Sequence, residues 1–123
     1  MPEGAMPSRL ERYEDTYRAL AEELATIGFI SPGSLISRTT VCGKLGCRCR
    51  ADPPERHGPY FQWSRAVGGR TISRRLGEKE AALYREWIDN RRRLERIIAE
   101  MTEVSAAAGE ILLRKARPKP AKP

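Results

Sequence analysis

The sequence predicts an α+β fold, in which two long heptad-patterned helices, arranged as a helical hairpin or coiled coil, flank a small cysteine-containing loop and a β-hairpin. Three observations predict it. Two segments repeat apolar residues at steps of three and four, a Gly-Gly pair separates two strand-like segments, and every cysteine and histidine of the 123-residue chain falls in one stretch. The length suits a single domain, predicted at residues 8–113, between a flexible leader at 1–7 and a basic, proline-rich disordered tail at 114–123.

The first helix is predicted at residues 9–27. Ser8 and Glu11 have the spacing of a capping box, in which each side chain hydrogen-bonds the other's backbone amide. Gly28 suits a left-handed cap at the helix end, and a short strand at residues 35–41 follows. The apolar stripe of this helix consists of Leu10, Tyr13, Tyr17, Leu20, Leu24 and Ile27.

The β-hairpin is predicted from strands at residues 60–67 and 70–76. Gly68-Gly69 meets the positive-φ demand of a two-residue type I′ turn between them. A cation–π contact is expected between Trp63 and Arg74, because the turn places them opposite each other. The other pairs expected from this turn are Val67 with Arg70, Arg65 with Ile72 and Phe61 with Leu76.

The second helix is predicted at residues 78–113, which is about twice the length of the first. The first helix is therefore expected to cover only half of its apolar stripe, and the segment 97–111 is predicted to seek a partner helix. A homodimer through this C-terminal helix follows as an expectation. The predicted interface residues are Leu94, Ile97, Met101, Val104 and Ile111.

One structural zinc ion is the predicted cofactor. Cys42, Cys47, Cys49 and His57 form a Cys₃His set, which gives zinc its preferred tetrahedron, and clustered cysteines favour metal over disulfide in a reducing cytosol. The C-x₄-C spacing is usual for zinc, whereas the C-x-C spacing is less common. Two alternatives are buried free cysteines beside an unrelated His57, and a redox pair formed by Cys47 and Cys49.

Positive charge is concentrated around these cysteines. Residues 31–75 carry nine bases and two acids, a net of +7, whereas residues 1–30 have a net of −3. Such a field attracts phosphates, and interleaved aromatic residues can stack on bases. Arg48 is open to two interpretations, a partner of the thiolates or a phosphate contact. The residues predicted to bind nucleic acid are Lys44, Arg50, Tyr60, Arg65, Arg70 and Arg75.

Catalytic motifs are missing from the sequence, so no enzyme is predicted. The zinc deaminase pattern, His-Glu-x-x-His and the phosphate-binding loop are all absent. No run of about 18 apolar residues indicates a membrane span, and Met1 to Ser8 lacks the apolar region of a secretory signal. A cytoplasmic location is the resulting expectation.

A combined motif connects these segments with a known family. It consists of Cys42-Gly43-Lys44, Cys47-x-Cys49 and His57-Gly58-Pro59-Tyr60, followed by Trp63. With it, the chain resembles an uncharacterised family of small bacterial proteins, a domain of unknown function often encoded near transposition genes. The resemblance implies an association with mobile DNA, and a transposition protein as a partner, but no activity.

Two functions from different classes follow from these observations. The first is a zinc-stabilised nucleic-acid-binding module associated with mobile DNA, supported by the basic segment. The alternative is a coiled-coil adaptor or dimerisation module without nucleic-acid activity, supported by the long heptads. The two are compatible, because many DNA-binding proteins dimerise.

Overall fold

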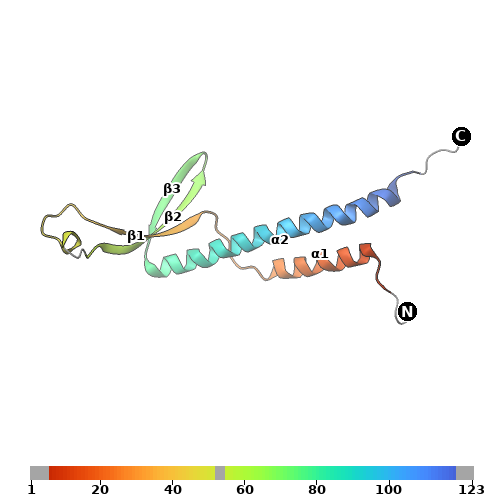
Figure 1. The fold of residues 1–123 in the computed structure, drawn as a ribbon, viewed down its shortest axis with the longest axis horizontal. Helices are drawn as coiled ribbons and strands as arrows, with labels where there is room; N and C mark the ends of the chain where they lie inside the picture. The colour runs from red at the N-terminus through yellow and green to blue at the C-terminus, as the bar shows by residue number, and fades with distance from the viewer. Residues whose placement is uncertain (1–5, 52–54, 119–123) are drawn as a thin grey trace. The chain divides into compact units, whose positions relative to one another are not determined.

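The computed structural model of the chain describes residues 6–51 and 55–118, and parts of the predicted leader (1–5) and tail (119–123) lie outside them. It confirms an α+β fold, with two helices and one three-stranded antiparallel sheet of order β1-β2-β3 (Figure 1). Neither helix is long and apolar enough to cross a membrane, within the residues described. The elements are α1 (Arg9–Ala25), β1 (Ser34–Thr40), the short 3-10 helix η1 (Arg48–Arg50), β2 (His57–Val67), β3 (Arg70–Leu76) and α2 (Glu78–Ala116).

The chain divides into two compact units, which are described separately. One comprises residues 28–92, and the other comprises residues 1–27 and 93–123. The sheet lies wholly in the first unit, α1 lies in the second, and α2 contributes to both. The predicted single domain, residues 8–113, therefore runs across both units.

The sheet is built on the β2–β3 hairpin. Its pairs run from Val67 with Arg70 to Phe61 with Leu76, as the two-residue Gly68-Gly69 turn predicts. β1 pairs with the other edge of β2, and this partnership extends β2 to His57, three residues before the predicted start. The antiparallel ladder between β1 and β2 satisfies backbone groups that a two-stranded hairpin leaves open.

The core of the first unit lies between the inner face of the sheet and the first part of α2. Its buried residues are Trp63, Leu76, Ala81 and Ile88. The indole Nε1 of Trp63 donates a hydrogen bond of 2.8 Å to the carbonyl of Pro32, so the polar edge of this buried ring is satisfied. Leu35, Phe61 and Tyr84 pack around this cluster.

The predicted cation–π contact between Trp63 and Arg74 is wrong. The guanidinium of Arg65 lies over the Trp63 ring instead, 4.1 Å from its centroid. Side chains two residues apart on a strand project from the same face, so Arg65 can reach the ring from the same strand. Arg74 is exposed, although it is the cross-strand partner of Trp63.

In the second unit, α1 begins as predicted but ends earlier. The amide of Glu11 donates to Ser8 Oγ over 3.1 Å, which confirms Ser8 as the N-cap. The helix ends at Ala25, where the Thr26 hydroxyl and amide both bond to the Glu23 carbonyl. Gly28 does not adopt the positive φ of a left-handed cap, so that prediction is wrong.

α1 runs antiparallel to the C-terminal part of α2 (Figure 1). Glu23, near the end of α1, lies 3.3 Å from both Arg93 and Arg96. Ile97 is completely buried within this single chain, so it is not available to a second chain. The other predicted interface residues are partly buried, and they are Leu94, Met101, Val104 and Ile111.

The prediction of a partner helix requires residues 97–111 to lie beyond the reach of α1. The structure contradicts this premise, because α1 packs on that half of α2 and the sheet packs on the other half. The helix also continues through Ala116, so Arg114–Ala116 are helical and not disordered. Arg114 and Lys115 in the last turn favour this extension through the helix dipole.

Candidate metal centre and the adjoining sheet face

The β1–β2 ladder brings the two ends of the cysteine-containing segment together. Its last pair is Thr40 with His57, so His57 at the start of β2 lies beside Cys42, two residues after β1 ends. Gly58, next to this histidine, has a φ of 115°. A side chain there would lie 2.9 Å from the Arg38 carbonyl oxygen, so only glycine fits beside the candidate ligand.

The remaining two cysteines are presented by a tight turn and η1. The amide of Cys47 donates to the Lys44 carbonyl over 3.4 Å, and the amide of Arg50 donates to the Cys47 carbonyl over 3.0 Å. Between them Gly46 has a φ of 82°, a conformation that glycine adopts without strain. These bonds turn Cys47 and Cys49 to the same side of the loop, where the other two candidate ligands lie.

The four ligand atoms of Cys42, Cys47, Cys49 and His57 lie within 4.8 Å of one another. The Sγ atoms of Cys42 and Cys49 are 3.5 Å apart, and Cys47 Sγ is 3.2 Å from His57 Nε2. A zinc tetrahedron with bonds of about 2.3 Å to sulfur and about 2.0 Å to nitrogen has edges of roughly 3.5–3.8 Å. The residues present therefore fit a metal ion such as zinc after small adjustments.

The surroundings of Cys42 also favour the thiolate form of its side chain. A backbone hydrogen bond from Lys44, followed by contacts with His57 and the other cysteines, lowers the pKa of Cys42 from 9.0 to about 6. Burial raises the pKa of Cys49, which is 1% exposed, although the Cys42 amide donates to its sulfur over 3.3 Å. A thiolate is the form of cysteine that binds metal, so Cys42 is already suited to that role near neutral pH.

The geometry also bears on the two alternatives to metal binding. His57 is not unrelated to the cysteines, because its Nε2 contacts Cys47 Sγ. The sulfurs of Cys42 and Cys49 lie 3.5 Å apart, and this is not the pair of Cys47 with Cys49 that the redox alternative requires. The arrangement thus favours one shared site over two independent functions.

Three of the basic residues in the loop have different surroundings. Arg50 Nε donates to the Cys42 carbonyl over 3.0 Å, so it supports the loop backbone as well as contributing charge. Arg48 lies 3.9 Å from Glu55, with both side chains mostly exposed, an arrangement that contributes little stability. Lys44 is exposed and lines a hollow of about 370 Å³ together with Cys42, Cys47, His57 and Tyr60.

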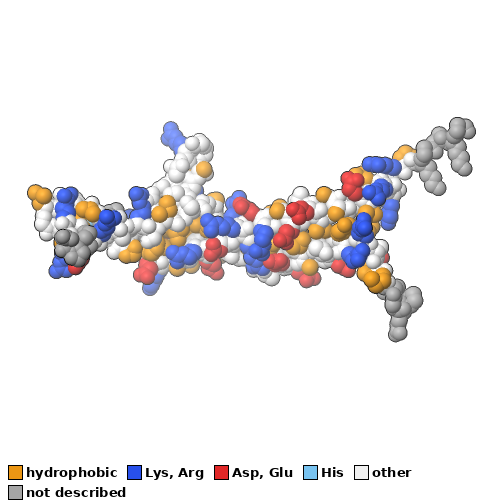
Figure 2. All heavy atoms as spheres, in the orientation of Figure 1, with side chains coloured by type: hydrophobic (Ala, Val, Ile, Leu, Met, Phe, Trp, Pro, Cys, Tyr) orange, Lys and Arg blue, Asp and Glu red, His pale blue; other side chains and the backbone are white. Residues whose placement is uncertain are grey.

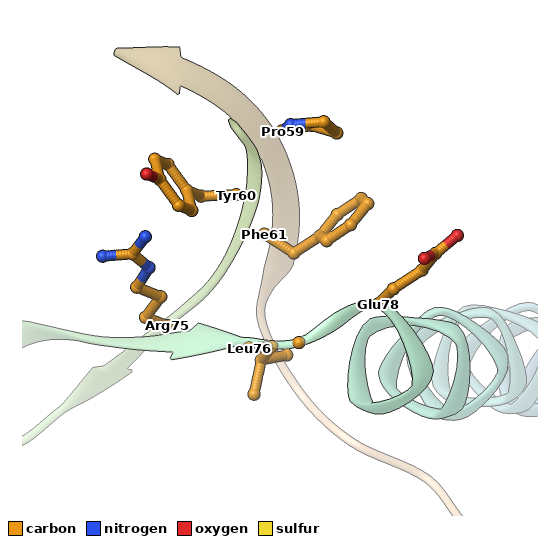
Figure 3. A pocket seen from close by; sticks show the side chains of 7 residues that line it. Pro59, Tyr60, Phe61, Arg75, Leu76 and Glu78 are labelled. Atoms are coloured by element: carbon orange, nitrogen blue, oxygen red, sulfur yellow. The ribbon is translucent and has the colours of Figure 1, made fainter. Parts of the chain in front are cut away.

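The predicted nucleic-acid contacts on the sheet are divided among different places. Arg75 lies over the Tyr60 ring, 3.5 Å from its centroid. Figure 3 shows these two side chains pointing toward one another, while Phe61 points the other way, beside a pocket of about 550 Å³. Arg65 lies on the inner face over Trp63 and is partly buried, which argues against a phosphate contact. Arg70 is exposed at the Gly-Gly turn.

Two further residues of this face were missed by the sequence analysis. Arg38 of β1 donates to the Gln62 side-chain oxygen of β2 over 3.3 Å. Both line a cleft of about 410 Å³ on the outer face, together with Tyr60 and Arg75. The signal that could have found them is the alternation of β1, because pairing that strand with β2 places Arg38 opposite Tyr60.

These features define a small α+β protein with a Cys₃His cluster able to hold a metal ion. The chain belongs to the family described as "Domain of unknown function (DUF6788)", whose match covers residues 6–86. The matched region includes all four candidate ligands and the whole sheet. No curated protein and no solved structure matches the chain.

Proposed function

We propose that this chain is a small nucleic-acid-binding module, stabilised by one structural zinc ion and associated with mobile DNA. The observation that carries the proposal is the convergence of Cys42, Cys47, Cys49 and His57 within 4.8 Å, inside the segment that holds the surplus of positive charge. Four protein ligands complete a zinc tetrahedron and leave no position for a reacting water. The metal is therefore assigned a structural and not a catalytic role.

The charge of the site supports phosphate binding. Three thiolates, a neutral imidazole and Zn²⁺ carry a net charge of about −1, which is small beside the basic surplus of the segment. Figure 2 shows Lys and Arg side chains at the tip of the β2–β3 hairpin and over the loop, whereas acidic and basic side chains alternate along the helices. The proposed phosphate contacts in this region are Lys44, Arg50, Arg70 and Arg75.

Salt dependence of binding tests this function. If about four residues meet phosphates, log K should fall with log salt at a slope of about −3.6 for duplex DNA, or about −2.8 for single strands. Replacing Arg70 and Arg75 by Ala should reduce the magnitude of the slope by about 1.8 for duplex DNA, or by about 1.4 for single strands. The matched control is Arg85→Ala with Arg92→Ala, which removes the same charge from exposed positions on α2. Equal slopes for wild type and the Arg70/Arg75 variant would reject the proposal.

The alternative function is a dimerisation or adaptor module, and one feature of the second unit favours it. An apolar groove of about 310 Å³ lies between α1 and α2, lined by Tyr13, Tyr17, Val104, Ala108 and Leu112 among others. Leu112 is 51% exposed there, so it is better placed than Ile97 to meet a second chain. Light scattering should then give about twice the chain mass of 13.9 kDa, and Leu112→Glu should restore the monomer. A monomeric wild-type protein at micromolar concentration would remove this alternative.

A further inference from the structure

We infer that the outer face of the three-stranded sheet is a platform for single-stranded nucleic acid. In this arrangement a base stacks on the pair formed by Tyr60 and Arg75, Gln62 hydrogen-bonds the base edge, and Arg38 and Arg75 contact flanking phosphates. The inference rests on the proposed nucleic-acid function and narrows its ligand to unpaired strands.

The register of the sheet assembles this platform from all three strands. Arg38 on β1 is directly opposite Tyr60 on β2, and Gln62 is directly opposite Arg75 on β3. Tyr60 and Gln62 are two residues apart, so they project from the same face. The arrangement places one aromatic ring, one amide and two guanidinium groups side by side.

The contacts between these side chains show that the platform is already assembled. Arg75 is stacked 3.5 Å from the centroid of the Tyr60 ring, and Arg38 holds the Gln62 amide at 3.3 Å. Farther along the same face Ser64 and Ser73 share a hydrogen bond of 2.9 Å. Planar groups held in this way lose little freedom when a planar base is added, which favours binding.

The cleft over these residues has the composition expected of such a site. Its volume is about 410 Å³, which is in the range of small-ligand pockets. Among the described residues, those that line it include no carboxylate, so nothing there repels a phosphate. Tyr60 also lines the hollow of about 370 Å³ that leads to Lys44, so a strand continuing past the ring meets a further positive charge.

A purely structural role explains Tyr60 less well. The inner-face aromatic residues Phe61 and Trp63 belong to the hydrophobic cluster of the unit, whereas Tyr60 is not among the residues packed on that cluster. Its ring contacts a charged guanidinium, and the residue lines three solvent-open hollows instead. An aromatic ring on an exposed sheet face is a feature that single-strand binders use.

Duplex nucleic acid fits this face poorly. Its bases are stacked on one another and offer only their edges in the grooves, so none can lie on the Tyr60 ring. Unpaired bases can be splayed out onto aromatic residues, and such stacking tolerates any sequence because every base has a flat face. The ligand class is therefore a single strand, of DNA or RNA, with little preference for sequence.

The test compares labelled 12-nucleotide oligo-dT, oligo-rU and a duplex of equal length, by fluorescence anisotropy with the zinc-loaded full chain. Wild type should bind the single strands more tightly than the duplex. Tyr60→Ala should weaken single-strand binding by about 5- to 150-fold, Tyr60→Phe should retain it, and duplex binding should change little. Arg75→Ala should weaken single-strand binding more than Arg70→Ala does, although Arg70→Ala removes the same charge from the same strand about 17 Å away.

Each outcome decides between separate claims. Equal or tighter binding of the duplex, or unchanged single-strand binding in Tyr60→Ala, overturns this inference and leaves the broader nucleic-acid proposal standing. Absence of salt-dependent binding to every probe overturns both. A preference for oligo-rU or oligo-dT identifies the strand as RNA or DNA. If Tyr60→Ala loses its zinc or the circular dichroism signal of its helices, the variants Gln62→Ala and Arg75→Ala test the inference instead. Single-strand affinity equal to that of wild type in both variants overturns the inference.

Discussion

Replacing Cys47 with serine should open the loop between β1 and β2 that carries the candidate cysteine ligands, while leaving the hydrophobic core of the sheet intact. Cys47 Sγ lies 3.2 Å from His57 Nε2, so the variant removes a sulfur that contacts the candidate histidine ligand. The buried cluster around Trp63 contains none of the four ligands. Loss of the metal should therefore affect the loop first.

The magnitude follows from the length of the segment that a bound metal ion would close. Sixteen residues lie from Cys42 to His57, and cross-linking a loop of about 15 residues stabilises the folded state by roughly 3 kcal/mol. The ladder pair of Thr40 with His57 should fray when this cross-link is lost. A local free energy lowered by roughly 3 kcal/mol corresponds to about a hundredfold faster amide exchange.

Hydrogen exchange measured by mass spectrometry checks this prediction peptide by peptide. Residues 41–51 should exchange about a hundredfold faster in Cys47→Ser, and equally fast in wild type treated with a chelator. Residues 78–92 of α2 should be unchanged. Leu45→Ser is the matched control, because Leu45 is in the same loop, 92% exposed, and not a candidate ligand. Exchange that responds neither to the chelator nor to Cys47→Ser would refute the metal site.

Three further predictions concern stability and reactivity. Gly33→Ala should lower the free energy of unfolding by about 2 kcal/mol or more, because the φ of Gly33 is 99° and a side chain there would overlap a β2 carbonyl. Gly109→Ala, in open space on α2, should instead raise the free energy of unfolding by up to about 1 kcal/mol, and thermal melts measure both changes. In chelator-treated protein at pH 7, iodoacetamide should modify Cys42 before Cys49, because a pKa of about 6 leaves Cys42 mostly as thiolate. Acidification below that pKa should slow the reaction of Cys42. Mass spectrometry that shows Cys49 modified first would contradict this prediction. Glu23→Ala should cost at most about 1 kcal/mol, and the loss should disappear in 1 M salt, since its two ion pairs with α2 are partly exposed.

The candidate metal site is the part of the molecule that the sequence specified best. All cysteines and the single histidine occur within sixteen residues, so the chain offers few other ways to arrange such ligands. The cluster of Cys42, Cys47, Cys49 and His57 in the structure agrees with that prediction. Local chemistry also determined the Ser8 cap and the Gly68-Gly69 turn, because each depends on residues close together in the chain.

The proposed binding face could not be predicted from the sequence in the same way. Arg38 and Gln62 are 24 positions apart, and only the pairing of β1 with β2 brings them into contact. Arg65 and Arg75 are both arginines of the same hairpin, yet one lies over a core tryptophan and the other over Tyr60 on the outer face. The register and the packing across strands determine on which face of the sheet each arginine side chain lies.

By itself, the sequence determined the helix and strand types, the turn and the ligand set, because periodicity, caps and ligand spacing act over a few neighbouring residues. The tertiary structure decided which surface covers which apolar stripe. The heptad pattern of α2 shows that the apolar side chains of residues 97–111 must pack against another segment, but the pattern does not identify that segment. Only the packing of α1 along that half of α2 showed that Ile97 is buried within its own chain, because burial depends on contacts between segments distant in sequence.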